Sequence, residues 1–275
     1  MFANGMASAP LIELINVTKS FDGERSLALR DASLRIDTGG FIALVGTSGS
    51  GKTTALKMIN RLIEPDRGEV RFAGEEVASL DAPTLRRRIG YVFQGIGLFP
   101  HMTIGENIAI TPQLLGWTKG DIAARVAELL DLVELPRSYG ARFPHALSGG
   151  QRQRAGVARA IAARPGVMLM DEPFGALDPV TRDTLGTSYR ALHERLGMTT
   201  VMVTHDVQEA VLLADRIVVM SAGRIVADDT PGALLSGHAS AEVSALMAMP
   251  RRQAERISEL LQADGREIPR HPPHG

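Results

Sequence analysis

The feature that most constrains this chain is a glycine-rich segment, residues 46–53 (GTSGSGKT), directly after the apolar run 41–45 (FIALV). The run is typical of a strand buried on both faces. The segment matches G-x-x-x-x-G-K-[ST], in which glycines let the backbone curl so that its N–H groups converge on phosphate oxygens. A helix is predicted from Lys52 to about Leu62, and its N-terminal end would attract an anion. A glycine-rich turn without a ligand is the alternative, but the flanking strand and helix favour a phosphate site.

Two adjacent carboxylates follow a second apolar run. Residues 167–170 (VMLM) read as a strand and lead into Asp171 and Glu172. Alone, such a pair is more often a helix cap or a solvated strand end. With a phosphate loop upstream, Asp171 is predicted to hold Mg²⁺ through water, and Thr53 to place its hydroxyl on the same ion. Glu172 is predicted to polarise the attacking water as a general base.

Composition limits the classes of function. The 275 residues, of which 44% are hydrophobic, suffice for one large α/β domain or two small ones. A formal net charge of -1 argues against a dedicated nucleic-acid binder, and the absence of cysteine excludes disulfides and thiolate metal sites and fits a reducing cytoplasm. No apolar run is long enough to span a bilayer, and residues 1–10 do not resemble a signal peptide. We therefore expect a soluble chain that reaches a membrane only through a partner.

Apolar strands alternate with helical segments over most of the chain. Strands are predicted at residues 11–17, 27–36, 41–45, 69–72, 167–170, 200–203, 216–220 and 225–227, with further helices near residues 183–196 and 206–214. This alternation predicts a mainly parallel sheet covered by helices. The region from about residue 93 to 156 instead carries helices and loops, with Asp121 as the predicted N-cap of one helix. After Gly237 a tail is predicted, with a weakly amphipathic segment at 255–261 and a disordered end at 269–275.

A third motif, LSGGQRQR, occupies residues 147–154. Ser148, Gly149 and Gly150 lead into a helix that is predicted to begin near Gln151. The free N–H groups and the dipole of such a helix start would favour an anion.

In this order, the three motifs resemble those of the nucleotide-binding subunits of ABC transporters, over roughly residues 11–235. The resemblance implies an α/β fold: a P-loop NTPase (RecA-like) core with a mainly parallel sheet, an N-terminal antiparallel β subdomain and an inserted helical subdomain at about residues 94–156. It divides the chain into a nucleotide-binding domain, residues 11–237, and a helical or disordered tail, residues 238–275. It also implies ATP and Mg²⁺ as cofactors.

The resemblance extends to single residues. Gln94 in YVFQ resembles the glutamine of the family's Q-loop, which would contact Mg²⁺ and the water. Residues 175–178 (GALD) resemble the D-loop, His205 resembles the switch histidine, and Phe21 stands where the family places an aromatic ring against adenine. Each of these residues also has an alternative interpretation when it is taken alone. Gln94 could be an ordinary loop residue, and His205 could have a structural role. Phe21 could belong to the core, and Asp178 could mark the start of a helix. Their joint occurrence in the family's order favours the functional interpretation.

The predicted site is therefore large and has three parts. The catalytic candidates are Glu172, His205 and Gln94, and the metal candidates are Thr53, Gln94 and Asp171. The nucleotide-binding candidates are Phe21, Gly46, Thr47, Ser48, Gly49, Ser50, Gly51, Lys52, Thr53, Thr54, Ser148, Gly149, Gly150, Gln151 and Asp178. The resemblance implies that the helix start at Ser148, Gly149, Gly150 and Gln151 faces the γ-phosphate of ATP held by a second copy, so that two chains sandwich two ATP molecules head to tail.

Residues 94–109 and 112–117 resemble ATPase subunits of bacterial importers for glycine betaine, choline and related osmoprotectants. Importers of polar amino acids and methionine share much of this sequence and stay open as alternatives. The candidates for contact with a membrane permease are Phe99, Pro100, His101 and Met102, unless they form a surface loop packed on their own subdomain. The resemblance implies a peripheral position on the cytoplasmic face of the membrane, with an external solute-binding protein engaged indirectly.

Two other classes of function fit this sequence less well. Soluble ABC ATPases of DNA repair or translation usually carry tandem nucleotide domains, coiled-coil arms or basic surfaces, whereas this sequence has one phosphate loop, no heptad arm and no basic excess. A nucleotide-binding regulator without turnover would not need Glu172 and His205. Both features favour a transport ATPase that binds no nucleic acid.

Overall fold

The computed structural model describes residues 10–23, 26–95 and 97–263. The strands are β1 Ile12–Ser20, β2 Leu27–Ile36, β3 Phe41–Val45, β4 Arg67–Phe72, β5 Glu75–Glu76, β6 Ile89–Val92, β7 Val167–Asp171, β8 Thr199–Val203, β9 Arg216–Ser221 and β10 Arg224–Asp229. The helices are α1 Lys52–Ile59, α2 Ala82–Arg87, α3 Ile104–Leu114, α4 Lys119–Leu132, α5 Gly149–Ala160, α6 Pro179–Leu196, α7 Val207–Leu213, α8 Pro231–Ser236 and α9 Ala241–Ala263. Short 3₁₀ turns lie at Val77–Ser79, Arg137–Ala141 and Pro144–Ala146.

A mainly parallel sheet forms the centre of the fold. Its strand order is β10-β9-β3-β8-β7-β6, and of its strands only β10 pairs antiparallel. Alternate residues of β3 enter two different apolar clusters: Phe41, Ala43 and Val45 pack on one face, and Ile42 and Leu44 on the other. Burial on both faces explains why β3 is a continuous apolar run rather than an alternating one. The predicted mainly parallel sheet is confirmed.

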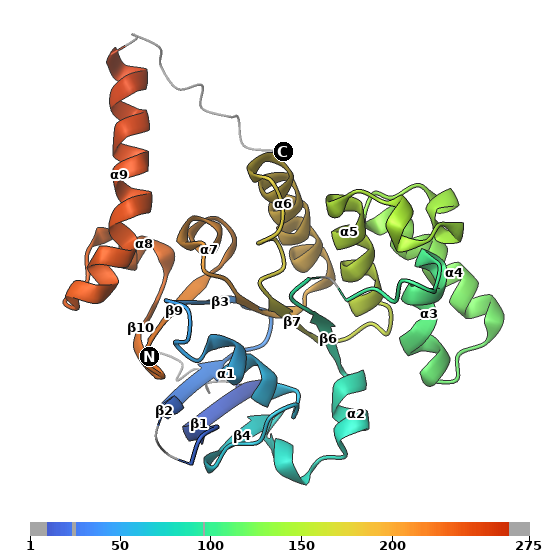
Figure 1. Cartoon of the computed structure of the whole chain (residues 1–275), viewed down its shortest axis with the longest axis horizontal. Coiled ribbons are helices and arrows are strands. Elements are labelled where there is room, and N and C mark those ends of the chain that lie inside the picture. The colour runs from blue at the N-terminus through green and yellow to red at the C-terminus, as the bar shows by residue number, and fades with distance from the viewer. Residues whose placement is uncertain (1–9, 24–25, 96, 264–275) are drawn as a thin grey trace, which may run out of the picture.

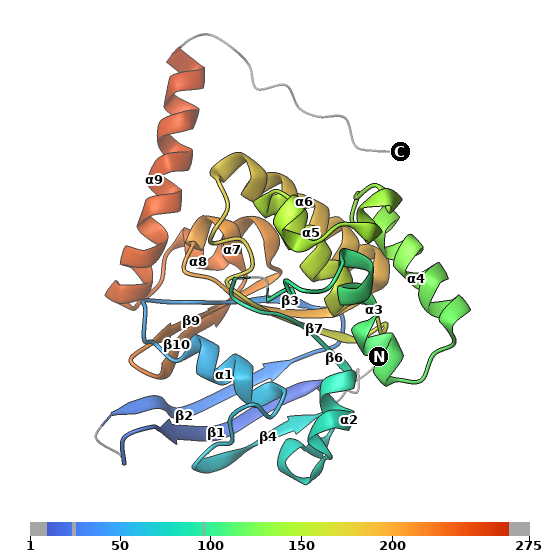
Figure 2. The same cartoon turned by 45° about the vertical axis from the view of Figure 1, so that its right-hand side comes forward.

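The second sheet is antiparallel and comes from the N-terminal part of the chain. Its strand order is β2-β1-β4-β5, with antiparallel pairing throughout. Helix α1 lies between the two sheets (Figure 2), and its Leu56 and Ile59 share a buried cluster with Leu14, Phe72 and Val201. The N-terminal antiparallel β unit predicted from the family resemblance is therefore present.

Helices α3, α4 and α5 follow β6 and precede β7, and they lie together beside the parallel sheet (Figure 1). Three helices, α4, α5 and α6, begin earlier than predicted. Thr118, not Asp121, caps α4, because the helix begins one turn earlier: the Thr118 hydroxyl accepts from the Asp121 N–H at 3.2 Å. Helix α5 begins at Gly149 rather than near Gln151, because Ser148 and Gln151 form a capping box, each side chain bonding the other residue's backbone N–H.

Helix α6 also begins earlier than predicted, at Pro179 instead of near Asp183. The Asp178 carboxylate accepts from the Thr181 N–H at 3.0 Å and so caps the helix. Proline at the first helical position loses no hydrogen bond, which allows this start.

Helix α8 ends just before the predicted tail of residues 238–275, and α9 lies within that tail. Val243 and Met247 of α9 join the apolar cluster that contains Leu234 of α8, whereas the far end of α9 projects beyond the rest of the described chain (Figures 1 and 2). The predicted segment 255–261 falls within α9, and the predicted disorder at 269–275 lies outside the described residues. Within the described part of the chain, no helix is both long enough and apolar enough to cross a bilayer.

We predict that Leu44→Ala strongly destabilises the protein, because Leu44 is fully buried in the central strand. A leucine-to-alanine change at such a position costs about 3 kcal/mol, from lost burial and the cavity left behind. The control Leu212→Ala removes a leucine that is 64% exposed and should change the free energy of unfolding by less than about 0.5 kcal/mol. Urea unfolding of both variants would measure this, and equal midpoints would contradict the assigned core.

Candidate functional site

The functional side chains follow the carboxyl ends of neighbouring parallel strands. Gly46 follows β3, Glu172 follows β7 and Thr204 follows β8. Backbone hydrogen bonds hold these exits together: the Glu172 N–H donates to Val203 O at 2.9 Å, and the Thr204 N–H donates to Leu44 O at 3.1 Å. Segments far apart in sequence therefore meet at one edge of the sheet, where α/β proteins bind ligands.

Two glycines of the loop are required by close backbone contacts. A Cβ atom on Gly46 would lie 2.0 Å from the Met220 carbonyl oxygen, and one on Gly51 would lie 2.3 Å from the Ala28 carbonyl oxygen. Both glycines also have positive φ angles, 150° and 99°, which residues with side chains rarely adopt. The loop is thus pressed between β9 and β2, and its shape depends on these two positions.

The Lys52 side chain lies inside the loop. It is buried, and its Nζ donates to the carbonyl oxygens of Gly46 at 2.8 Å and Thr47 at 2.9 Å and to Ser50 Oγ at 3.3 Å. Burial lowers the pKa of Lys52, while the charges of Glu172 and Asp171 oppose that effect. A lysine ammonium ringed by loop carbonyls at the start of a helix is suited to a phosphate group.

Thr53 and Asp171 meet directly, although 118 positions separate them in sequence. The Thr53 hydroxyl donates to Asp171 Oδ1 at 2.9 Å, and Asp171 is only 4% exposed. Burial raises the pKa of Asp171, and the hydrogen bond from Thr53 partly offsets it. A hydroxyl and a carboxylate are hard oxygen donors, so this pair fits Mg²⁺, which binds proteins through few such ligands.

The three predicted catalytic residues meet at one oxygen atom. Gln94 Nε2 donates to Glu172 Oε2 at 3.1 Å, and His205 Nδ1 lies 3.4 Å from the same oxygen. Glu172 has a φ of 46°, a left-handed conformation that costs a non-glycine residue about 1–3 kcal/mol. The backbone N–H of Glu172 donates to Val203 O, which ties this strained residue to the edge of the sheet.

The start of α5 lies beside the start of α6. A Cβ on Gly150 would lie 2.8 Å from Thr181 Cγ2, and one on Gly149 would lie 3.6 Å from Leu177 Cδ2. In both views α5 lies apart from α1 (Figures 1 and 2). Ser148, Gly149, Gly150 and Gln151 are therefore grouped with Asp178 and separated from the phosphate loop of their own chain.

Phe21 is exposed, at 65%, so it does not belong to the core. It follows β1, and Lys19 Nζ lies 5.7 Å from the centre of its ring. The adjoining strand β2 supplies the Ala28 carbonyl that lies against Gly51, so the hairpin that carries Phe21 borders the loop. No interaction between Phe21 and the loop itself is seen among the described residues.

The predicted permease-contact residues form an exposed loop that a buried asparagine braces. Phe99 is 45% exposed and its ring lies 5.9 Å from that of His101. Asn107, fully buried at the start of α3, accepts from the Phe99 N–H at 2.8 Å and donates to the carbonyl oxygens of Phe99, Met102 and Thr103 at 2.9–3.2 Å. The loop is therefore held in shape while its aromatic side chains face outward.

Next to this loop is a hollow of about 250 Å³. Its lining includes Arg86, Arg87, Phe93, Phe99 and Arg159. Phe93 is 46% exposed, so apolar rings and basic groups lie side by side at the surface. Such a mixture suits a helix or loop that carries both apolar and acidic side chains.

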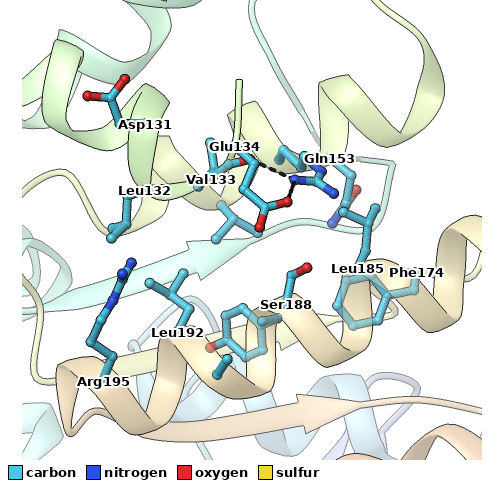
Figure 3. A pocket seen from close by; sticks show the side chains of 14 residues that line it. Asp131, Leu132, Val133, Glu134, Gln153, Phe174, Leu185, Ser188, Leu192 and Arg195 are labelled. Atoms are coloured by element: carbon cyan, nitrogen blue, oxygen red, sulfur yellow. Dashed lines mark hydrogen bonds and ion pairs between the residues drawn. The ribbon is translucent and has the colours of Figure 1, made fainter. Parts of the chain in front are cut away.

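A further cavity, of about 370 Å³, lies between the helices α4–α5 and α6 (Figure 3). Leu185 and Leu192 line it from α6, and Val133 and Glu134 line it from the end of α4. Gln153 is 2% exposed, and its Nε2 has no partner among the described residues. None of the predicted site residues lines this cavity, so it is separate from the chemistry.

Sequence reasoning missed a charged network behind His205. Arg182 donates to Asp206 Oδ2 at 2.8 Å and to the Leu177 carbonyl oxygen at 3.1 Å. Thr204 donates to the carboxylate of Glu209, which is 8% exposed. Burial raises the pKa of Glu209 to about 7. Asp206 was recognisable as a helix start, but no local signal links it to Arg182, which lies 24 positions earlier.

Known proteins resemble this chain in sequence. The ABC transporter family profile matches residues 29–175. The chain is 52% identical over 226 residues to the glycine betaine uptake system ATP-binding protein YehX of Escherichia coli (strain K12), covering 82% of this chain and 73% of that protein. It is 49% identical over 241 residues to the choline transport ATP-binding protein OpuBA of Bacillus subtilis (strain 168), covering 88% of this chain. The chain spans 63% of the length of OpuBA, which is less than two thirds.

Among solved structures, the ATP-binding cassette MJ0796 matches over 80% of this chain and 98% of that chain, with a TM-score of 0.71 and 34% identity. That structure is a dimer in a post-hydrolysis state, bound to ADP and Pi.

We predict that Glu209 makes the stability depend on pH. Its pKa in the folded chain, about 7, exceeds the ordinary value of 4.5, so the folded state binds this proton more tightly. The contribution of Glu209 to the free energy of unfolding is fully present below pH 4.5. It is lost as the pH rises through about 7, by up to about 3 kcal/mol. Between pH 5 and pH 8, the melting temperature of the wild type should fall more than that of Glu209→Gln. Parallel plots of melting temperature against pH for these two proteins would contradict the prediction. The control Glu242→Gln alters an exposed glutamate and should follow the wild type.

Proposed function

This chain belongs to the ABC transporter family, and on that premise we propose that it is the ATP-binding subunit of an importer. It hydrolyses ATP in a head-to-tail dimer and so drives uptake of quaternary amine osmoprotectants such as glycine betaine and choline. The observation that carries this proposal is the meeting of Glu172, Gln94 and His205 at one oxygen, beside the loop that holds Lys52.

ATP binds with its phosphates in the loop of residues 46–54. Lys52 contacts the β- and γ-phosphates, and the loop backbone and the start of α1 supply N–H groups. Phe21, exposed on the bordering hairpin, stacks on adenine. The exposure of that ring is consistent with a ligand-stacking role, since a core phenylalanine would be buried.

Thr53, Asp171 and Gln94 are the residues that would hold Mg²⁺, with Asp171 acting through water. When bound, it neutralises charge on the phosphate oxygens. The 2.9 Å contact between Thr53 Oγ1 and Asp171 Oδ1 supports this assignment, because the two donors already converge.

Glu172 orients and deprotonates the attacking water. Water is a poor nucleophile at neutral pH, so a carboxylate at hydrogen-bond distance accelerates its attack. Gln94 and His205 both contact Oε2 of Glu172, which fixes the direction of the carboxylate. His205 is then close enough to the reacting groups to bond a γ-phosphate oxygen.

The second half of each site comes from a second copy of the chain. The start of α5 lies apart from the phosphate loop of its own chain, so Ser148, Gly149 and Gly150 serve the ATP of the partner. Leu177 and Thr181, which lie on either side of Asp178 in the chain, border Gly149 and Gly150, so Asp178 is assigned to the same contact. The dimeric state of the MJ0796 cassette supports this arrangement.

The membrane permease docks on the loop of residues 99–102 and the adjoining hollow. The exposed rings of Phe93 and Phe99 and the arginines 86 and 87 offer apolar and basic contacts for a helix from that subunit. The chain is thereby peripheral on the cytoplasmic face of the membrane, and a solute-binding protein engages the transporter from outside. The names of YehX and OpuBA support the osmoprotectant class over amino acids or methionine.

We predict that Glu172→Gln keeps ATP binding within about twofold but lowers turnover by at least about 100-fold, because the base is lost and the shape is kept. The test reconstitutes the chain in vesicles with the membrane and binding-protein subunits encoded beside it, and follows ATP hydrolysis and uptake of labelled glycine betaine and choline. Uptake should require ATP and disappear in Glu172→Gln. If Glu172→Gln hydrolysed ATP at the wild-type rate, Glu172 would not be the general base. If only methionine or histidine were taken up, the osmoprotectant assignment would be wrong.

We predict that Ser148→Arg abolishes cooperative ATP hydrolysis while ATP still binds the monomer. Arginine at the start of α5 would block the approach of a second copy, but α5 is remote from the chain's own phosphate loop. Ser148→Ala is the smaller change at the same position: it removes the cap, which costs about 1 kcal/mol, and the hydroxyl of the proposed ATP contact, but it leaves room for a second copy, so it should slow hydrolysis less than Ser148→Arg does. Turnover against protein concentration measures the effect, and undiminished hydrolysis by Ser148→Arg would contradict the dimer site.

A further inference from the structure

The loop that carries His205 is fixed on both sides of the histidine. Before it, the Thr204 N–H donates to Leu44 O, and the Thr204 hydroxyl donates to Glu209. After it, Asp206 Oδ1 accepts from the N–H group of Glu209 at 3.3 Å and that of Gln208 at 3.0 Å, which caps α7. The backbone of His205 is therefore clamped, whereas its side chain remains 59% exposed.

Arg182 ties this clamp to another segment of the site. One terminal nitrogen donates to Asp206 Oδ2 at 2.8 Å, and the other donates to the Leu177 carbonyl oxygen at 3.1 Å. Leu177 belongs to residues 175–178, the D-loop-like segment. A Cβ atom on Gly175 in that segment would lie 3.5 Å from His205 Cε1, so the segment also borders the histidine ring. One guanidinium thus spans two segments that flank Glu172.

The same cluster contains two buried polar atoms without a partner among the described residues, Arg182 Nε and Glu209 Oε1. One is a donor and the other an acceptor, and the Arg182 charge acts on Glu209. Both residues line a pocket of about 430 Å³ between α6 and α7. The network is therefore incompletely bonded, so a movement of either segment that gave these two atoms a partner would be favourable.

We propose that Arg182 is a positioning residue for ATP hydrolysis: it couples residues 175–178 to the loop of His205 and so sets His205 against Glu172. The inference rests on the proposed function, in which residues 175–178 face the second copy. Closure of the dimer would then change the position of His205 through the side chain of Arg182. A guanidinium is suited to this task because its rigid fork bonds two acceptors at once.

Arg190 provides a matched control. It lies on the same helix, its side chain is 28% exposed compared with 27% for Arg182, and it also joins α6 to the end of α7 through the Leu213 carbonyl oxygen. It pairs with Asp215 and Glu194, away from His205. A purely structural role for Arg182 would make the two arginines equivalent.

The experiment compares Arg182→Gln with Arg190→Gln in the full chain by kcat, KM, ATP affinity and melting temperature. Arg182→Gln should lower kcat roughly 10- to 100-fold, because small misplacements of catalytic groups cost about that much. Its ATP affinity and melting temperature should match those of Arg190→Gln. Arg182→Lys, which keeps the charge but not the fork, should recover only part of the rate. Equal kcat values for the two glutamine variants would overturn the inference.

A double-mutant cycle with Asp206→Asn tests the coupling itself, since asparagine can still cap α7. The double variant Arg182→Gln/Asp206→Asn should be no slower than Arg182→Gln, and fully multiplicative losses would overturn the inference.

Amide hydrogen exchange gives a readout without turnover. Arg182→Gln should speed exchange in residues 175–178 and 204–206 together, and Arg190→Gln should not; unchanged exchange in Arg182→Gln would overturn the coupling. A wild-type chain that binds but does not hydrolyse ATP would instead refute the proposed function, while exchange would still decide whether Arg182 couples the two segments.

Discussion

The parallel pairing of β3, β8, β7 and β6 is the constraint on which the rest of the structure depends. Parallel strands end at the same edge of a sheet, so every segment that leaves this edge emerges near the others. The phosphate loop follows β3, Asp171 ends β7 and Glu172 follows it, and His205 comes two residues after the end of β8. Because the strands are buried on both faces, neither a shift in register nor a rotation can separate these exits without exposing apolar side chains.

Burial also shifts the pKa values of charged groups in the site. Lys52 and Asp171 both lose water, which lowers the pKa of the amine and raises that of the acid. In each case desolvation disfavours the charged form of the side chain, whereas neighbouring groups of opposite charge stabilise that form. The same cause acts on Glu209, where it raises the pKa to about 7. A phosphate and a cation bound between these groups would meet charges that water screens only weakly.

A single copy holds the motifs in two separate groups. The loop around Lys52 and the carboxylate of Glu172 belong to the sheet edge, whereas Ser148 and Asp178 lie together at the starts of α5 and α6. The cavity between α4–α5 and α6 leaves the packing of the helical insert against the core incomplete (Figure 3). In the proposed dimer, the group at the starts of α5 and α6 would meet the sheet-edge group of the second copy.

The sequence by itself determined the features that depend on neighbours in the chain. The run 41–45, the glycine pattern after it and the apolar run before Asp171 predicted buried strands and a phosphate loop, because strand burial and loop curvature are local properties. The sequence located the helix starts less exactly. Thr118 and Ser148 are the N-caps of α4 and α5, so both helices begin earlier than the predictions based on Asp121 and Gln151. In each case a polar residue three positions after the true N-cap had marked the predicted start.

Only the tertiary structure decided which distant groups meet. It brought Thr53 within 2.9 Å of Asp171 and joined Arg182 to Asp206. It also gave the reason for Gly46, whose missing side chain leaves room for the Met220 carbonyl. Motif order had pointed to the first pair through a family resemblance, but nothing in the sequence marked Arg182 or Glu209. Contacts of this kind depend on strand order and helix packing, which a linear pattern does not encode.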